Sequence, residues 1–116
     1  MIYKLSKQGI LHKNKTFQAV YRSGKSYANR MVVLYVLPNN SNVRRIGFAA
    51  GKRLGNAVVR NRVKRLLRDS YRLNQSKLIS GMDLILVGRQ AAVLSNRMAV
   101  EKAFLHLCDK AKILAK

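Results

Sequence analysis

The residues best suited to chemistry in this chain are cations at helical spacing. Four of them recur at four-residue intervals: Arg60, Lys64, Arg68 and Arg72. This spacing places them along one side of a helix, with Arg65 adjacent, and only Asp69 is available there as an ion-pair partner. Segment 52–72 holds eight Lys or Arg, about twice what an even spread would give. Guanidinium groups bind phosphate oxygens through paired hydrogen bonds, so the segment predicts phosphate binding.

Groups for acid–base or metal chemistry are scarce. His12 and His106 lie far apart in the sequence, and a solitary surface histidine is the commoner explanation for each. A helix would turn His106 and Cys108 to opposite faces, so no zinc site is expected. The glycines around position 51 lack the Gly-Lys-Ser/Thr ending of a phosphate-binding loop. We therefore expect a binding protein, with any bond cleavage supplied by another subunit or by an RNA with its own metal ions.

The charge distribution indicates a polyanionic partner. Lys and Arg number 24 against four acids, the formal net charge is +20, and no acid occurs in the first 68 residues. A merely solvated basic face usually mixes acids among its cations. Self-repulsion on a small folded body is relieved most directly by a polyanion. Nucleic acid is the expected partner. An anionic membrane is a weaker candidate, because the basic helix lacks an exposed aromatic face for insertion.

Length and composition favour one folded domain over residues 1–116, since the chain is 48% apolar. Its single cysteine, Cys108, cannot form an intramolecular disulfide, and no run approaches the ~18 apolar residues of a membrane span. No export or anchoring signal is visible. We expect a cytoplasmic protein.

Hydrophobic periodicity predicts a two-layer α/β sandwich with the order helix, strand, strand, helix, strand, helix, and room for one more short strand. The expected helices cover about 14–23, 56–73 and 95 onward, with Asn14 and Asn56 as N-caps and Gly24 as a stop. The expected strands cover 31–37, 45–52 and 82–87, the first two forming a hairpin. A β-α-β crossover follows, and crossovers are usually right-handed.

The strand at 45–52 has one face made of Gly47, Ala49 and Gly51. Glycine weakens a strand unless something must approach the backbone, so this face indicates either tight helix packing or an open groove floor. Packing is the commoner arrangement. Lys52 and Arg53 at the strand end favour the groove, because a shallow floor flanked by cations suits a nucleic-acid strand.

Segment 47–68 closely resembles the signature of the protein subunit of bacterial ribonuclease P. Its most specific part reads Gly-Asn-Ala-Val-x-Arg-Asn-Arg over positions 55–62, followed by Lys-Arg at 64–65. The likeness extends to Phe17-Gln18-x-Val20-Tyr21, to Gly24 with Ala28-Asn29-Arg30, and to Leu34-Tyr35, so it covers nearly the whole chain. Two positions depart from the pattern, since Gly51 stands where many members have serine and Leu114 where some have an aromatic.

The resemblance implies an α+β fold with the order α-β-β-β-α-β-α and a left-handed β-α-β crossover. It also implies that a ribonuclease P RNA is the partner. In this family the RNA, with bound magnesium, hydrolyses one phosphodiester bond of precursor tRNA to release the 5′ leader. The protein assists this endonuclease as one copy per RNA and carries no catalytic residue, metal site or cofactor of its own.

Two sets of site residues follow from the resemblance. Contacts to the catalytic RNA are implied for Arg60, Asn61, Arg62, Lys64, Arg65 and Arg68. A cleft for the 5′ leader is implied for Phe17, Tyr21, Tyr35, Lys52 and Arg53. For Phe17 and Tyr21 plain core packing is the alternative, although a phenol suits a wet groove. A ribosomal or RNA-packaging protein is the second functional hypothesis, and it would show no dependence on a leader.

Overall fold

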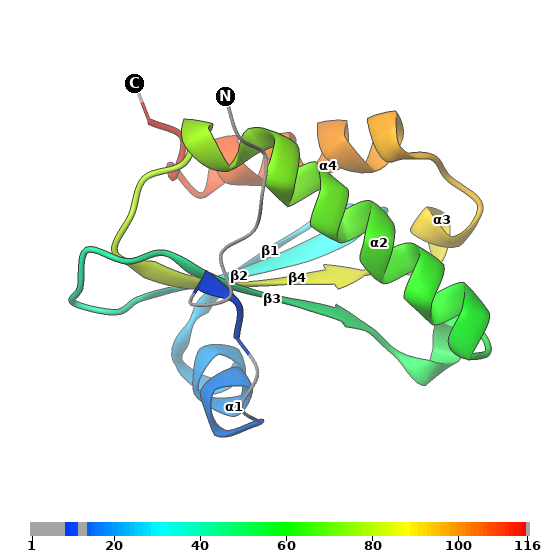
Figure 1. Cartoon of the computed structure of the whole chain (residues 1–116), viewed down its shortest axis with the longest axis horizontal. Coiled ribbons are helices and arrows are strands. Elements are labelled where there is room, and N and C mark those ends of the chain that lie inside the picture. Colours follow the sequence, from blue (N-terminus) through cyan, green and yellow to red (C-terminus); the bar gives the residue numbers. More distant parts are fainter. Residues whose placement is uncertain (1–8, 12–13, 116) are drawn as a thin grey trace.

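The computed structural model describes residues 9–11 and 14–115, which form a mixed α+β fold (Figure 1). The helices are α1 (Asn14–Ser23), α2 (Ala57–Asn74), α3 (Gln90–Val93) and α4 (Arg97–Lys110), with single 3-10 turns η2 (Lys52–Leu54) and η3 (Gln75–Lys77). The strands are β1 (Lys25–Ala28), β2 (Val32–Pro38), β3 (Arg45–Ala50) and β4 (Met82–Gly88). The predicted order of elements is confirmed, and the short α3 is the one addition among the α-helices of the described residues.

The four strands form one sheet in the order β1-β2-β4-β3. The predicted hairpin between β2 and β3 is wrong, because β4 lies between them, antiparallel to β2 and parallel to β3. The physical reason is that β4 is apolar on both faces and almost entirely buried, which suits a central strand. Helix α2 connects the parallel pair β3 and β4, as the crossover prediction required. Its left hand stays a prediction.

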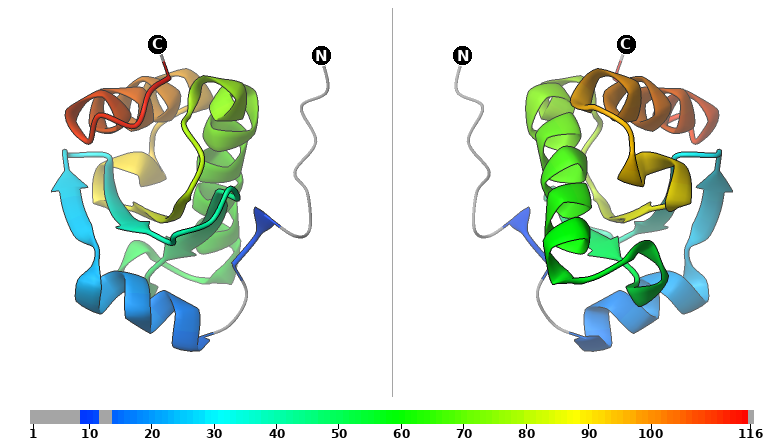
Figure 2. Two further views of the ribbon diagram at one scale, coloured as in Figure 1. Left: turned by 90° about the vertical axis from the view of Figure 1, so that its left-hand side faces the viewer. Right: turned by 90° about the vertical axis from the view of Figure 1, so that its right-hand side faces the viewer.

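Helices cover the two faces of the sheet unequally (Figure 2). Both α2 and α4 pack on one face, where Leu34, Ile46, Leu84 and Phe104 are fully buried in the main core. Of the helices in the described part of the chain, α1 alone packs on the other face, around a smaller cluster of buried residues: Leu11, Val20 and Ile85. Because α1 is short, part of this second face stays accessible.

The helix boundaries follow from local polar groups. The side chain of Asn56 accepts a hydrogen bond of 3.1 Å from the Val59 N–H and starts α2 as predicted. Helix α4 starts in the same way at Asn96. Helix α1 stops at Gly24, whose N–H donates to the Val20 carbonyl. A Cβ on Gly24 would lie 2.6 Å from that same oxygen, so no side chain fits there.

Candidate nucleic-acid interface

Helix α2 separates a core face from a cationic face, as its sequence periodicity predicts. Val63, Leu67 and Ser70 are buried against the sheet and α4. The residues predicted to contact RNA lie on the other side or at its margin. Four are exposed and two are half-buried: Asn61, Arg62, Arg65 and Arg68, then Arg60 and Lys64. The structure therefore gathers all six predicted RNA contacts on one helix.

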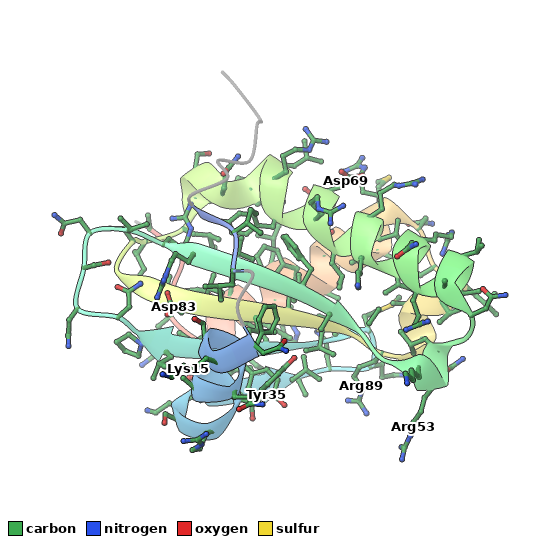
Figure 3. The ribbon with its side chains drawn as sticks, turned by 60° about the horizontal axis from the view of Figure 1, so that its bottom comes forward. Lys15, Tyr35, Arg53, Asp69, Asp83 and Arg89 are labelled. Atoms are coloured by element: carbon green, nitrogen blue, oxygen red, sulfur yellow. The ribbon has the colours of Figure 1, made fainter. Side chains whose placement is uncertain are left out.

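Much of the cationic charge on this helix is not neutralised by the protein. Within the described residues, acids form ion pairs with Arg45, Arg72 and Arg97. The partner of Arg72 is Asp69, at 3.5 Å, and Figure 3 shows Asp69 on the outer side of α2. The side chains of Lys64 and Arg65 form no hydrogen bond or ion pair with any described residue. Charges of this kind are available to an external anion.

Two further arginines of the face have distinct surroundings. The Arg68 guanidinium lies over the Phe48 ring, 5.6 Å from its centroid, which holds its stem against the body. Arg60 is half-buried, and its Nε is buried without a hydrogen-bond partner among the described residues. A buried donor of this kind is stabilised when it finds an acceptor. Both arginines therefore lie beside Lys64 and Arg65, the two cations of this face whose side chains have no partner among the described residues.

Arg62 differs from its neighbours because its guanidinium contacts the protein itself. Its Nη1 donates to the Val93 carbonyl at 2.7 Å, and its Nη2 donates to the Ser95 carbonyl at 2.6 Å. These hydrogen bonds join the first turns of α2 to the connection between α3 and α4. Sequence spacing placed Arg62 at the margin of the cationic face but could not reveal these carbonyls.

Three aromatic side chains form a wall on the other face of the sheet. The rings of Tyr21 and Tyr35 meet edge to face, with centroids 4.8 Å apart, and the Phe17 ring lies 6.3 Å from that of Tyr21. Tyr21 is 40% exposed. Partial burial, and to a smaller extent the neighbouring Tyr35, raise the pKa of the Tyr21 phenol above its usual value. The hydroxyl therefore stays protonated and can donate a hydrogen bond at neutral pH.

The glycine face of β3, which continues to Gly51 just after the strand, shows both helix packing and an open groove floor. At Gly47 the Phe17 ring lies so close that an added Cβ would be 2.4 Å from its Cζ, so helix packing applies there. At Gly51 an added Cβ would meet no atom within 4 Å, so the surface is open. Between them Ala49 is half-buried and lies in one row with Val33 and Val87. This row forms an apolar floor beyond the aromatic wall.

Cations flank the far end of that floor. A hollow of about 360 Å³ is lined there by Gly51, Arg53, Val87 and Arg89, among others. Figure 3 shows Arg53 and Arg89 at this end of the sheet and Tyr35 beside α1. Lys52 and Arg53 are exposed on η2. The aromatic wall, the apolar floor and these cations are together called the groove below.

Sequence reasoning missed Arg89. Its Nη1 donates to the Asn29 carbonyl at 2.9 Å, and its N–H donates to the Met31 carbonyl. These bonds fix Arg89 beside the floor. The available signal was its position two residues after the buried strand predicted at 82–87, since residues at strand ends reach the sheet edge. Asn29, in turn, donates to the Ala103 carbonyl of α4, which links the groove to the opposite layer.

The arrangement is suited to holding an anionic, base-bearing strand. Among residues 9–11 and 14–115 no three His, Cys, Asp or Glu side chains gather as metal ligands would. His106 is exposed on α4, and His12 lies outside the described residues. In the same described part of the chain, no helix has the length and apolar character needed to cross a bilayer.

Comparisons with known proteins agree on one family. Residues 5–112 match the family model described as Ribonuclease P. The ribonuclease P protein component of Natranaerobius thermophilus is 47% identical over 106 residues, covering 91% of this chain and 92% of that protein. The component from Alkaliphilus metalliredigens is 42% identical and covers 90% and 95%. A solved Staphylococcus aureus RNase P protein superposes with a TM-score of 0.83 at 32% identity, covering 92% of this chain and 98% of that one.

Proposed function

Because the chain belongs to the ribonuclease P protein family, we propose that it is the RNA-binding subunit of that ribonucleoprotein and acts in maturation of the tRNA 5′ end. It holds the catalytic RNA on one surface and the 5′ leader of precursor tRNA on another. The observation that carries this proposal is the uncompensated charge of α2 beside a groove with an aromatic wall. Cleavage itself belongs to the RNA partner.

The α2 face is the proposed contact for the catalytic RNA. Among the residues that the structure describes, the side chains of Lys64 and Arg65 have no hydrogen-bond or ion-pair partner, and the Nε of Arg60 is a buried donor without an acceptor. Phosphate oxygens supply acceptors in the geometry that guanidinium groups prefer. Asn61 and Arg68 flank these groups on the exposed side of the helix. Arg62 contributes by holding the segment around Val93 and Ser95 in place beside them.

The groove is the proposed contact for the single-stranded leader. The exposed ring of Tyr21, supported by Phe17 and Tyr35, offers a surface on which a base can stack. Lys52 and Arg53 lie where the backbone phosphates of the strand would leave the floor. Stacking accepts any base, because every base has a π-face, so the groove would tolerate leaders of varied sequence.

In this proposal the RNA carries out the cleavage reaction and the protein binds and orients the RNA strands. Magnesium would be held by phosphate and base oxygens of that RNA, where it supplies a bound water and stabilises developing charge. The side chains of the protein neutralise phosphates and orient the leader. We propose a cytoplasmic complex with one protein per RNA, in which the protein binds no cofactor of its own.

Reconstitution tests this proposal directly. The purified protein is incubated with precursor tRNA, alone and with the ribonuclease P RNA, at low and high magnesium. We expect no cleavage by the protein alone and a clear gain in RNA-dependent cleavage at low magnesium. Mature tRNA serves as the matched substrate without a leader, and it should bind more weakly. Cleavage at the mature 5′ end by the protein alone would refute the proposal that the RNA cleaves the bond. Equal binding of precursor and mature tRNA would indicate a general RNA-packaging protein.

A further inference from the structure

A second hollow lies away from the groove, on the other face and at the other end of the sheet. Its volume is about 440 Å³, within the usual range of small-molecule sites. It is enclosed by the start of β1, the end of β2, the connection before β4 and the residues after α4. Val36 and Tyr27, which line it, pack against the main core beneath α2 and α4. The groove cations lie at the opposite end of β2, about 20 Å away for a strand of this length.

The walls of this hollow are fixed by the backbone. The Ile79 N–H donates to the Ile113 carbonyl at 2.9 Å, and Leu78 and Leu114 form an antiparallel bridge. Gly81 has a φ of 84°, and a Cβ there would lie 2.9 Å from the Ser41 carbonyl oxygen. The hollow is therefore formed before any ligand arrives, which lowers the entropic cost of binding.

The lining combines apolar side chains with positive charge. Its apolar lining includes Val36, Ile79, Met82 and Ile113. Lys25 and Lys112 are the charged residues of the lining, and no acid is among them. Ile79 is 42% exposed, although a side chain of its size is usually buried. A ligand that fits must carry a negative charge and an apolar body.

Lys112 is held in a backbone conformation that glycine normally occupies. Its φ is 59°, and it is the second residue after the end of α4, with its N–H donating to the Asp109 carbonyl. An L side chain in this region is disfavoured relative to glycine. This conformation ends the helix, because the N–H groups of Lys112 and Ile113 donate back to the Asp109 and Cys108 carbonyls, and the residue found there places a cation beside the hollow.

We propose that this hollow binds a small organic anion with one acidic group, carboxylate, sulfonate or phosphate, on an aromatic or branched aliphatic body. Lys25 and Lys112 would attract the acidic group, and the body would cover Ile79 and Met82. This site is independent of the proposed RNA contacts, because it shares no residue with α2 or with the groove.

The test uses 2-naphthalenesulfonate as the probe and amide resonances of the full-length protein as the readout. We expect saturable shifts at Tyr27, Gly81 and Ile113 on titration. Sodium sulfate tests charge alone and 2-naphthalenemethanol tests the ring alone, and both should bind at least fivefold more weakly. Shifts confined to α2 or the groove, or equal responses to all three compounds, would overturn the proposal.

Lys112→Gly separates binding from folding. Glycine relieves the positive φ, so the variant should be at least as stable as the parent in a thermal melt. Its affinity for the probe should fall about fivefold, as expected for losing one solvent-screened charge. Lys25→Gln should act similarly, whereas Lys110→Gln, an equal loss of charge outside the lining, should change nothing. Unchanged affinity in both lining variants would refute recognition by these lysines.

Discussion

Replacing Arg62 with alanine should lower the stability of the fold and leave the number of RNA phosphates contacted unchanged. The substitution removes two hydrogen bonds, of 2.7 and 2.6 Å, to the carbonyls of Val93 and Ser95. Each charged hydrogen bond of this kind contributes about 1.5 to 3 kcal/mol when buried, and exposure reduces this to roughly half. The expected loss for the two bonds together is about 1.5 to 3 kcal/mol. In a domain of this size that lowers the Tm by roughly 5 to 15 °C.

Two measurements distinguish a role of Arg62 in holding the segment around Val93 and Ser95 from direct contact between Arg62 and RNA. Thermal melts report the stability, and binding to the ribonuclease P RNA at several salt concentrations reports the phosphate contacts. Each lost phosphate contact reduces the slope of log K against log salt by about 0.7 to 0.9. We expect Arg62→Ala to lower the Tm and weaken binding without changing this slope.

The matched control is Arg65→Ala, since Arg65 lies on the same helix and its side chain has no hydrogen-bond or ion-pair partner within residues 9–11 and 14–115. It should reduce the slope by about one contact and change the Tm by no more than about 2 °C. Arg62→Lys should recover only part of the stability, because an ammonium lacks the planar fork that reaches two carbonyls. An unchanged Tm together with a reduced slope for Arg62→Ala would refute the reasoning and assign Arg62 to the RNA.

Four further outcomes are expected. Phe17→Ala should weaken the binding of precursor tRNA by about fivefold or more, because stacking contributes roughly 1 to 3 kcal/mol per base. The affinity for precursor tRNA would then be close to that for mature tRNA, whereas an equal loss of affinity for both tRNAs would indicate that Phe17 serves only the core. Gly47→Ala should destabilise the fold by about 1 to 3 kcal/mol in urea denaturation, because the new Cβ overlaps the Phe17 ring. Adding Phe17→Leu to the same chain should recover part of that loss. Burial raises the pKa of Cys108 from 9.0 to about 12, so the thiol should resist a disulfide reagent at pH 8 until the protein is unfolded. Because the unfolded thiol ionises first, stability should decline from pH 9 toward 12 more steeply in the parent than in Cys108→Ala, and equal declines would contradict this linkage.

The helix that carries the cationic face could be predicted almost completely from sequence. The helix begins where the N-cap Asn56 predicts, and its buried and cationic faces follow from the helical repeat of 3.6 residues. The cap and the repeat are both properties of the local sequence. The buried Val63 and the exposed Arg65 lie where this periodicity placed them. Strand β4 was found equally well, because a run that is apolar apart from Asp83 needs burial on both faces.

Strand order could not be obtained in this way. The turn after Pro38 favoured a hairpin between β2 and β3, but hairpin formation competes with pairing of both strands to β4. The central position of β4 buries more apolar surface than an edge position would, and this advantage depends on residues more than 30 positions apart in the chain. Local turn chemistry therefore lost to a non-local gain in burial.

The amino-acid sequence alone predicts a polyanionic partner, since a net charge of +20 is combined with very few groups for acid–base chemistry. Which of the cations are available to such a partner depends on the folded arrangement. It paired Arg62 with carbonyls of a distant connection, placed Arg89 at the groove, and set Phe17 against Gly47 so that the glycine face is packed at one end and open at the other. Charge and periodicity are properties of single segments, whereas the partner of each donor depends on which segments the core brings together.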